Sequence, residues 1–345
     1  MKSLYDFNYE QIQEFALEQG WKKFRGHQIF QWLYRSRVKE INEMSNLSKE
    51  TRELLKENFL ISPLPLREKQ VARDGTTKYL FALSDGSLIE SVLMQFDYGK
   101  SVCVTSQVGC NMGCAFCASG LTRKQRDLTS GEMVAQVLYI QQELDAKEER
   151  VSHIVVMGTG EPFDNYDNVM NFLATVNHDR GLAIGARHIT ISTCGIVPRI
   201  DAFAQEHTQY NLAISLHAPN DELRSRLMPI NRAYPLSELM AALDRYGAEN
   251  NRRLTLEYIL LRGVNDQPVH ARQLAALIGR RNAYVNLIPY NAVDEKGFQG
   301  VDHAAAMVFY DQLMKLGVRC TIRKEHGSDI DAACGQLRVK HLQKG

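Results

Sequence analysis

The sequence predicts an α/β protein whose larger, second part contains a parallel sheet. The first observation behind this is that, from Ser101 onward, short apolar stretches alternate with longer amphipathic ones, as in successive β–α units. The strand candidates are 101–106, 152–157, 187–192, 210–216, 254–261, 283–288 and 318–323. The helix candidates between them are 129–146, 165–176, 236–248, 267–280 and 302–316. Because ligands of such folds bind at the carboxyl ends of the strands, we expect the functional site there.

The second observation is that the first part of the chain has the periodicity of helices. Within residues 8–60, apolar side chains recur at helical spacing, and Ser48 followed by Lys49 and Glu50 predicts the start of the last of these helices. Pro63 and Pro65 then end the helical segment, since proline cannot continue a helix. We therefore expect a small helical domain ahead of the α/β part.

One stretch of this helical segment is basic and aromatic. Residues 21–39 contain no acidic residue, whereas they contain six Lys or Arg and five large aromatic residues: Lys22, Lys23, Arg25, Arg35, Arg37, Lys39, Trp21, Phe24, Phe30, Trp32 and Tyr34. Such a mixture can neutralise phosphates and stack on splayed bases. It can equally form the core and the solvated face of a small domain. We interpret the aromatic residues mainly as core and the basic residues as candidates for RNA docking.

A hairpin is predicted between the two parts. The apolar stretches 77–83 and 88–94 flank a Ser-Asp-Gly-Ser turn at 84–87. Glu90 lies in the second stretch among apolar neighbours. Burial would raise the pKa of its carboxyl group and make it a usable proton acceptor, but an outward-facing strand glutamate would fit the same pattern. The residues alone leave both interpretations open.

Size, charge and cysteine content restrict the class of protein. The 345 residues suffice for one large domain or a large domain with an appendage. The net charge of +1 gives no indication of nucleic-acid binding, so any such argument must be local. The N-terminus lacks the apolar core of a signal peptide, and no run of roughly 18 apolar residues predicts a membrane span. We expect a cytoplasmic protein whose seven cysteines are mostly reduced, which suits metal binding or thiol chemistry.

Three cysteines carry the clearest chemical signal. Cys110, Cys114 and Cys117 have spacings of four and three residues in Cys-Asn-Met-Gly-Cys-Ala-Phe-Cys, so one loop can bring three thiols to one metal centre. A structural zinc site would need a fourth ligand, and the nearest candidates, Cys103 and His153, are distant in the sequence. An iron–sulfur cube can instead be held by three thiolates, with one iron left for a substrate or cofactor.

This Cys-x3-Cys-x2-Cys spacing resembles that of the radical S-adenosylmethionine (SAM) enzymes. Further segments resemble the RlmN-type RNA methyltransferases among them: 101–110, Gly-Thr-Gly-Glu-Pro at 158–162, 187–193, Ser-Leu-His at 215–217 and 329–337. The resemblance runs from about Phe24 to Leu337. It implies a partial (β/α)6 radical SAM barrel with a small N-terminal helical domain and a β-hairpin extension. The implied division is 1–62, an RNA-docking domain; 63–97, the extension; 98–326, the barrel; and 327–345, a C-terminal segment.

The resemblance also implies an activity and its cofactors. Members of the family methylate carbon 2 of an adenosine in 23S rRNA, at the peptidyl-transferase centre, and of the adenosine 3′ of the anticodon in tRNA. Because that carbon is electron-poor, a radical route is more reasonable than a polar methyl transfer. A [4Fe-4S] cluster would be held by Cys110, Cys114 and Cys117. SAM would be bound by residues at the carboxyl ends of candidate strands: Gly160, Glu161, Ser192, Ser215, Leu216, His217 and Asn291.

Three catalytic residues are carried over by the same resemblance. Cys334 matches the cysteine that is methylated by a first SAM, loses a hydrogen atom with the help of a second, and adds to the adenine. Cys103 matches the cysteine that forms a disulfide with Cys334 to release the product, and Glu90 matches the glutamate that removes the proton. Cys194 and Cys320 we assign to packing, because both stand in apolar settings.

Partners and alternatives complete the expectations. The expected partners are 23S rRNA, tRNA and an electron donor such as flavodoxin or ferredoxin, and we expect a monomer. Basic residues at 123–126, and Arg319, Arg323 and Lys324, are candidates to hold RNA phosphates. One alternative is a Cfr-type enzyme, which methylates carbon 8 of the adenosine and confers antibiotic resistance. The other is a non-catalytic RNA-binding protein that uses its thiols for zinc or redox sensing.

Overall fold

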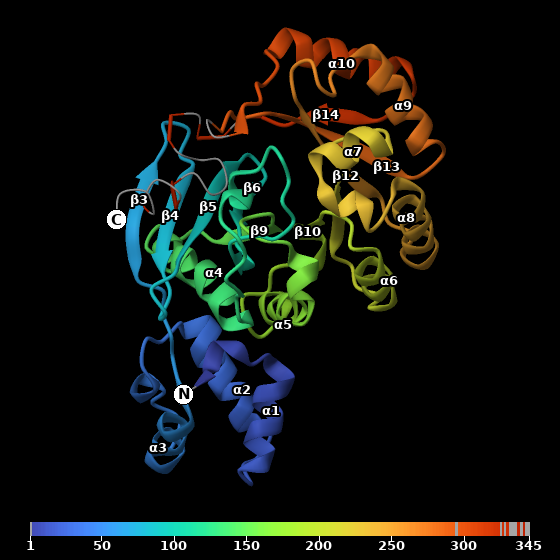
Figure 1. Ribbon diagram of the computed structural model, residues 1–345. Helices are drawn as coiled ribbons and strands as arrows, with labels where there is room; N and C mark the ends of the chain where they lie inside the picture. The colour runs from blue at the N-terminus through green and yellow to red at the C-terminus, as the bar shows by residue number, and fades with distance from the viewer. Residues whose placement is uncertain are drawn as a thin grey trace.

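The computed structural model describes residues 2–293, 296–324, 326–327, 329–330, 337–338 and 341 (Figure 1). Its helices are α1 (Tyr9–Glu18), α2 (Phe24–Gln31), α3 (Lys49–Asn58), α4 (Ser130–Asp145), α5 (Tyr166–Asn177), α6 (Val197–Gln205), α7 (Asp221–Leu227), α8 (Leu236–Asn250), α9 (Pro268–Ile278) and α10 (His303–Lys315). None of the helices in this part of the chain is both long and apolar enough to cross a membrane.

Ten strands form one mixed sheet that runs through the larger part of the molecule. Its strands, in spatial order, are β14 (Cys320–Ile322), β13 (Ala283–Pro289), β12 (Leu254–Leu260), β11 (Asn211–Ser215), β10 (Ile189–Thr193), β9 (Val151–Val156), β6 (Gly99–Cys103), β5 (Leu88–Phe96), β4 (Thr77–Ala82) and β3 (Leu66–Val71). The strands from β14 to β6 are all parallel, whereas β5, β4 and β3 are antiparallel. The parallel half comprises six β–α units followed by β14, the arrangement of a partial (β/α)6 radical SAM barrel.

The helices cover the parallel strands in contacting pairs. The helix α4 packs against α5, α6 against α8, and α9 against α10. Their apolar faces and the strands enclose one continuous core, in which the largest fully buried side chains include Phe163, Phe172, Phe203, Tyr246 and Phe309. Burial of this apolar surface is the main stabilising contribution for a sheet covered in this way.

The N-terminal helices lie at one end of the molecule, beside α4 and α5 (Figure 1). A short helical turn at Leu4–Asp6 meets the start of α4, where the side chain of Asp6 accepts the backbone N–H of Gly131 at 2.9 Å. Arg37 forms an ion pair with Asp145 at the other end of α4 at 2.6 Å. The short strands β1 (Lys2–Ser3) and β2 (Phe59–Leu60) pair with each other and close this region.

The aromatic residues of this region divide as follows. Phe30 and Tyr34 are fully buried, Trp21 and Trp32 are half-buried, and Phe24 is 49% exposed. The interpretation as core is therefore correct for Phe30 and Tyr34 but wrong for Phe24. The basic residues Lys22, Lys23 and Lys39 are exposed.

The predicted strands and helices are confirmed, with ends that differ by a few residues. Two helices, α6 and α7, were not predicted; with nine and seven residues they are too short to give a clear apolar periodicity. The hairpin was predicted as two strands, but β3 adds a third and β5 pairs with β6, so the extension continues the main sheet. This continuity places Glu90, on β5, in the same sheet as the barrel strands.

Candidate active site

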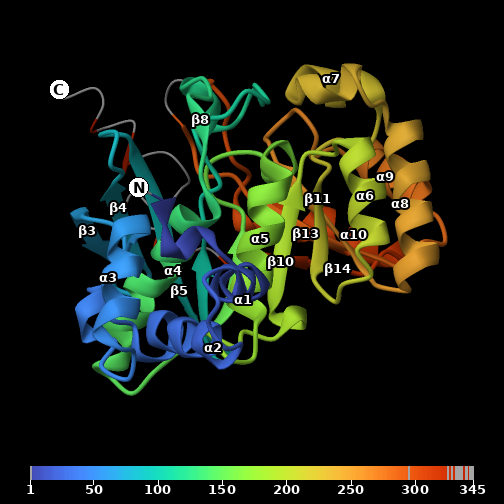
Figure 2. The ribbon, with the colours of Figure 1, turned by 90° about the horizontal axis from the view of Figure 1, so that it is seen from below.

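The three cysteines of the Cys-x3-Cys-x2-Cys motif lie on one loop that leaves and rejoins the barrel between β7 (Gln107–Val108) and β8 (Arg126–Asp127). Backbone hydrogen bonds hold this loop at both sides: the N–H of Cys110 donates to the carbonyl of Thr122 at 3.2 Å, and that of Ala115 to the carbonyl of Leu227 at 2.8 Å. Leu227 is the last residue of α7, and Figure 2 shows β8 and α7 at the same side of the sheet.

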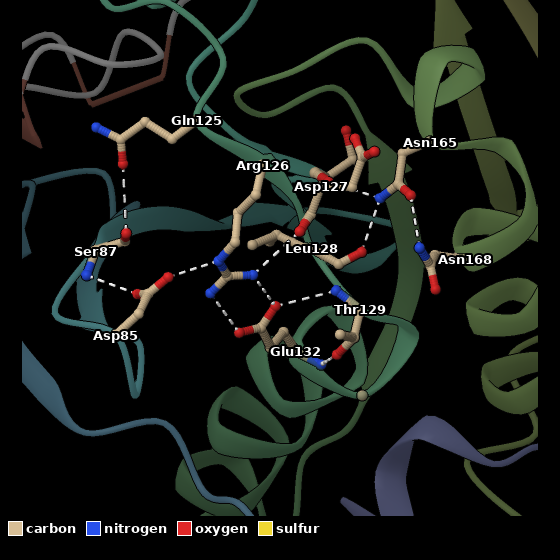
Figure 3. A network of polar contacts seen from close by, with 12 residues as sticks. Asp85, Ser87, Gln125, Arg126, Asp127, Leu128, Thr129, Glu132, Asn165 and Asn168 are labelled. Carbon is tan, nitrogen blue, oxygen red and sulfur yellow. Dashed lines mark hydrogen bonds and ion pairs between the residues drawn. The ribbon is translucent and has the colours of Figure 1, made fainter. Parts of the chain in front are cut away.

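Arg126 fastens the base of this loop to two other elements (Figure 3). Its guanidinium donates to Asp85 in the β4–β5 turn at 2.6 Å and to both carboxylate oxygens of Glu132 in α4 at 2.8 Å. Glu132 also accepts the N–H of Thr129, and thus completes a capping box at the start of α4. The loop, the extension and the first barrel helix are therefore joined at one residue.

A cavity of about 260 Å³ brings the three cysteines together with the ends of the barrel strands. Besides Cys110, Cys114 and Cys117, it is lined by five of the residues expected to bind SAM: Gly160, Glu161, Ser192, Ser215 and His217. The hydroxyl groups of Ser192 and Ser215 lie 3.3 Å apart, at the ends of β10 and β11. Leu216 is fully buried and does not line this cavity, and Asn291 lines a neighbouring one.

Gly160 and Glu161 follow the end of β9 and are held in place in different ways. Gly160 has a φ of +110°, and a Cβ atom there would lie 2.6 Å from Gln107, so only glycine fits. The Glu161 carboxylate accepts the backbone N–H groups of Phe163 and Cys194 at 3.0 and 2.7 Å. Burial raises the pKa of Glu161. Its carboxylate thus ties the end of β9 to the end of β10, and its contribution to a ligand would come from the backbone.

His217 is buried and held in one tautomer. Its Nδ1 accepts the backbone N–H of Ile259 at 3.1 Å, so the proton of the neutral ring is on Nε2. The ring packs edge-on against Phe116, with centroids 4.9 Å apart. Burial, with a smaller effect of Arg224, lowers the pKa of His217 from 6.5 to about 3. At neutral pH the side chain is therefore an uncharged hydrogen-bond donor at the edge of the cavity.

This burial predicts a pH dependence of stability. The pKa of His217 is about 3 in the folded chain and 6.5 in the unfolded one. The contribution of His217 to the free energy of unfolding is therefore fully present above pH 6.5 and is lost as the pH falls towards 3. In His217→Asn, the amide oxygen can replace Nδ1 as acceptor, and asparagine tolerates the φ of +57°. In the wild type, the free energy of unfolding should decrease between neutral and mildly acid pH. We expect urea titrations to show a smaller decrease for His217→Asn.

His207 provides the matched control for that measurement. It is an exposed histidine that also has a positive φ, of +48°. The variant His207→Asn should keep the wild-type dependence of unfolding on pH. If His217→Asn kept it as well, the assignment of the acid-sensitive contribution to His217 would be wrong.

A second cavity of about 260 Å³ adjoins the first and contains Cys103. The two cavities share five lining residues: Phe116, Cys117, Ile259, Ile288 and Arg323. The second is otherwise mostly apolar, with Val92 and Met94 of β5 and with Tyr290, whose hydroxyl group donates to the carbonyl of Phe116 at 3.0 Å. Arg323, Lys324 and His326 add positive or titratable groups to its lining. A thiol thus lies in an apolar space directly next to the cysteine loop.

Glu90 is buried beside this second cavity rather than in its lining. It is 4% exposed and lies on β5 two residues before Val92, so both side chains are on the same face of the strand. One carboxylate oxygen lies 3.0 Å from the ammonium of Lys78, and the other accepts the N–H of Arg338 at 2.5 Å. The interpretation of Glu90 as an outward-facing residue is therefore wrong.

Cys334 lies outside the described residues. Residues on either side of it contact the extension: Asp329 accepts the N–H of Arg73 at 3.2 Å, and Arg338 contacts Glu90. His341 forms a hydrogen bond with Glu68 of β3. The described parts of the C-terminal segment thus lie against β3, β5 and the β3–β4 turn.

Some residues at the site were not expected from the sequence. Cys194 lines the first cavity, so its assignment to packing is incomplete, whereas Cys320 is buried under α10, near the carbonyl of Tyr310. Arg224, on the short helix α7, is fully buried and donates to the carbonyls of Cys194, Ser215 and Leu216. Its only signal in the sequence was an Asn-Asp-Glu helix start at 220–222.

The basic residues expected to bind phosphates differ in their partners and positions. Lys124 is paired with Asp127 and Asp164, and Arg126 with Asp85 and Glu132, so their charges are already compensated. Arg319 bonds to Asn282 at the start of β13, the end of the strand opposite to the cavities. Arg323 and Lys324 line the second cavity.

The cysteine loop fits an iron–sulfur cluster. Burial raises the pKa of Cys110 to about 11 and that of Cys114 still higher, so these thiols need nearby positive charge to become thiolates, which bound iron supplies. Within the described residues, no three His, Cys, Asp or Glu side chains converge closely enough to hold a single metal ion. Three thiols that line one cavity are a ligand set that an iron–sulfur cluster can use, in which each of three irons takes one thiolate.

Comparisons with known proteins agree with this geometry. Residues 104–275 match the model of the radical SAM superfamily, and residues 2–61 match that of the ribosomal RNA large subunit methyltransferase N-terminal domain. A probable dual-specificity RNA methyltransferase RlmN of Enterococcus faecalis is 57% identical over 348 residues, which cover 99% of this chain and 98% of that protein. Its counterpart in Listeria welshimeri is 58% identical over 347 residues, 99% of this chain and 95% of that protein.

A solved structure is similar over the whole fold. The crystal structure of a radical SAM methyltransferase from Sphaerobacter thermophilus superposes with a TM-score of 0.92 at 42% identity and covers 97% of this chain and 99% of its own. With the cysteine loop at the ends of the barrel strands, these matches settle the family. The chain belongs to the RlmN-type dual-specificity RNA methyltransferases of the radical SAM superfamily, which use a [4Fe-4S] cluster and SAM.

Proposed function

We propose that the protein methylates carbon 2 of an adenosine in 23S rRNA and of the adenosine 3′ of the anticodon in tRNA, through a methylated Cys334 and with two SAM molecules for each product. The observation that carries this proposal is the position of Cys103 in an apolar cavity that shares its wall with the cavity of the three cluster cysteines. Chemistry at one cavity can therefore reach a thiol and a base in the other.

Residues of the first cavity would hold the cofactors. Cys110, Cys114 and Cys117 would bind the cluster, while Ser192, Ser215 and the Nε2–H of His217 offer hydrogen bonds to SAM. Together the reduced cluster and SAM supply hydrogen-atom abstraction, which an unactivated methyl group requires. Asn291, which lines the second cavity, would contribute to SAM binding from there.

The second cavity would receive the adenine. Carbon 2 is hidden in a stacked helix, so the base has to be flipped out into a pocket of its own. The apolar side chains of Val92, Met94 and Ile288 suit an aromatic base, and Arg323 and Lys324 suit the phosphate that accompanies it. This combination supports a nucleotide of RNA as the occupant.

Three residues would share the chemistry at the base. Cys334 would carry the methyl group, Glu90 would take the proton from carbon 2, and Cys103 would form a disulfide with Cys334 to free the product. Arg338 follows Cys334 by four positions, and four residue steps of fully extended chain span at most about 14 Å. Because the N–H of Arg338 contacts Glu90, the length of the chain is compatible with all three roles.

The N-terminal helices would dock the RNA. A surface cavity of about 480 Å³ between the starts of α2 and α3 is lined by Trp21, Lys22, Phe24 and Arg25, among others. The exposed ring of Phe24, with the guanidinium of Arg25 4.9 Å from its centroid, offers both a stacking face and a positive charge. A flavodoxin or ferredoxin as the electron donor, a monomeric state and a cytoplasmic location stay predictions.

Nucleoside analysis tests the proposal directly. We expect cells that contain the protein, compared with cells that lack it, to have 2-methyladenosine in both 23S rRNA and tRNA, as measured by mass spectrometry. Detection of 8-methyladenosine alone would contradict the proposal in favour of the carbon 8 reaction. Modification of rRNA without tRNA would contradict its dual specificity.

A further inference from the structure

We propose that Lys78 is the positioning residue of the proton-abstraction step: its ammonium places a positive charge against the carboxylate of Glu90 and fixes the orientation of that carboxylate. This inference rests on the proposed role of Glu90 as the proton acceptor. Lys78 belongs to none of the motifs described above.

The sheet register brings the two side chains together. Lys78 on β4 pairs with Val92 on β5, Val92 pairs with Cys103 on β6, and Cys103 pairs with Val155 on β9. Residues in such a row share one face of the sheet, and it is the face that lines the second cavity through Val92 and Cys103. Glu90 lies on the same face two residues before Val92, diagonal to Lys78. The ammonium and the carboxylate are 3.0 Å apart.

The burial of this pair calls for an explanation. The side chain of Lys78 is 0% exposed and that of Glu90 is 4% exposed. Removing two charges from water is costly, and a well-packed apolar pair is often as stable as a buried ion pair. Stability alone therefore gives little reason for a lysine at this position. A carboxylate that must accept a proton gives a specific one.

Electrostatics decides the protonation state of a buried carboxyl group. Burial favours the neutral acid, which cannot accept a proton, whereas an adjacent cation favours the carboxylate. Among the described residues, the carboxylate of Glu90 contacts the ammonium of Lys78 on β4 and the backbone N–H of Arg338. The backbone carbonyl of Glu90 accepts the hydroxyl group of Thr105, and Cys103 on β6 pairs with Val92, two residues along β5. Two positive charges act on this carboxylate: the ammonium of Lys78 forms an ion pair with it at 3.0 Å, while the guanidinium of Arg338 donates to Thr122 at 2.9 Å and attracts Glu90 from farther away.

The step itself is a simple proton transfer. After the Cys334 methylene has added to carbon 2, the C–H bond at that tetrahedral carbon breaks, the proton goes to a carboxylate oxygen of Glu90, and the bonding electrons restore the aromatic ring. The one electron that radical addition leaves in excess would pass to the oxidised cluster. Lys78 does not touch the base in this step. It acts through Glu90, by holding one oxygen and leaving the carboxylate charged.

The test compares four variants of the purified, cluster-containing enzyme over a range of pH. In Lys78→Met we expect product formation about 10²-fold lower at neutral pH, the lower end of what general-base catalysis contributes. The loss should diminish as the pH rises, because Glu90 then ionises without its partner. Lys78→Arg should retain most activity, since it keeps the charge. Reductive cleavage of SAM should be unchanged in all variants, because the first cavity is untouched.

Two further variants separate this inference from its premise. Glu90→Gln should lose product at every pH. If Lys78 acts through Glu90, as proposed, adding Lys78→Met to Glu90→Gln should cause no further loss. The double variant removes both buried charges, so it should fold even if Lys78→Met alone does not. The matched control is Lys69→Met. Lys69 lies on the neighbouring strand β3 and is also bonded to a glutamate, Glu143 of α4.

The outcomes are distinct. A loss in Lys78→Met that is the same at all pH values, or a further loss in the Glu90→Gln background, would overturn the role of Lys78. Wild-type product formation by Glu90→Gln would instead overturn the proposed role of Glu90. If Lys78→Met does not fold, the test depends on Lys78→Arg. The proposal then requires that the activity of Lys78→Arg fall at acid pH as it does in the wild type. A shift of that acid limb in a fully stable variant overturns the proposal.

Discussion

Replacement of Cys334 by alanine is expected to abolish methylated adenosine completely, while the enzyme still binds its cluster and cleaves SAM. The reason is that Cys334 would carry the methyl group that reaches the base, whereas the cluster cysteines and the SAM-binding residues line a cavity that this change leaves intact. Mass spectrometry of rRNA and tRNA measures the first effect. Visible absorption of the cluster and release of methionine under reducing conditions measure the second.

Cys103→Ala is the informative companion to that variant. Without Cys103 the disulfide cannot form, so we expect the adenine to stay attached to Cys334 and a covalent protein–RNA product to accumulate, which a denaturing gel detects. Cys320→Ala is the control, because Cys320 is a buried cysteine on β14 outside both cavities, and it should leave product formation intact. Methylated adenosine from Cys334→Ala, or the absence of any adduct from Cys103→Ala, would contradict the proposed route.

Much of the fold could be predicted because parallel strands are apolar on both faces and are separated by amphipathic helices. The strands β9 to β13 and the helices α4, α5, α8, α9 and α10 all have such patterns. The helix α7 does not, since two turns contain too few apolar positions to reveal a period. The strand β3 alternates between half-buried and exposed residues, a weak pattern that the flanking prolines at 63 and 65 obscured.

The site was predictable to the extent that its residues stand at strand ends or in the cysteine motif. Ser192, Ser215 and His217 meet the cysteines because every parallel strand of the barrel ends at the same edge. Lys78 and Arg224 could not be identified in this way. Their burial depends on contacts with distant segments: Lys78 with β5, and Arg224 with the ends of β10 and β11. Hydropathy treats both as surface residues.

Arg224→Met is expected to cause the largest loss of stability among single changes in the barrel. The guanidinium of Arg224 is fully buried and donates to the carbonyls of Cys194, Ser215 and Leu216 and to the side chain of Asn231, at 2.7 to 3.3 Å. Each buried acceptor that loses its donor costs about 1–3 kcal/mol, so a total of about 4 kcal/mol is expected in the free energy of unfolding. Urea titration measures this difference.

Arg245→Met is the matched control for that titration. Arg245 also forms two hydrogen bonds to an oxygen-bearing partner, Asp201, but it lies on the surface between α8 and α6, and its side chain is 53% exposed. Its loss should leave the urea midpoint nearly unchanged, because water replaces the lost partner. Equal midpoints for Arg224→Met and the wild type would show that the carbonyls find other donors.

The same substitution should also weaken SAM binding in the fraction that folds. The three carbonyls belong to the ends of β10 and β11, where Ser215 and His217 line the cavity of the cysteines, so their release alters the positions of both side chains. Arg224→Lys keeps the charge but cannot reproduce the planar fork that reaches separate carbonyls, so we expect an intermediate effect. A purely global loss of stability would lower the amount of active enzyme and leave the KM for SAM unchanged. A raised KM for SAM with normal cluster absorption would therefore show that Arg224 supports the strand ends that bind SAM.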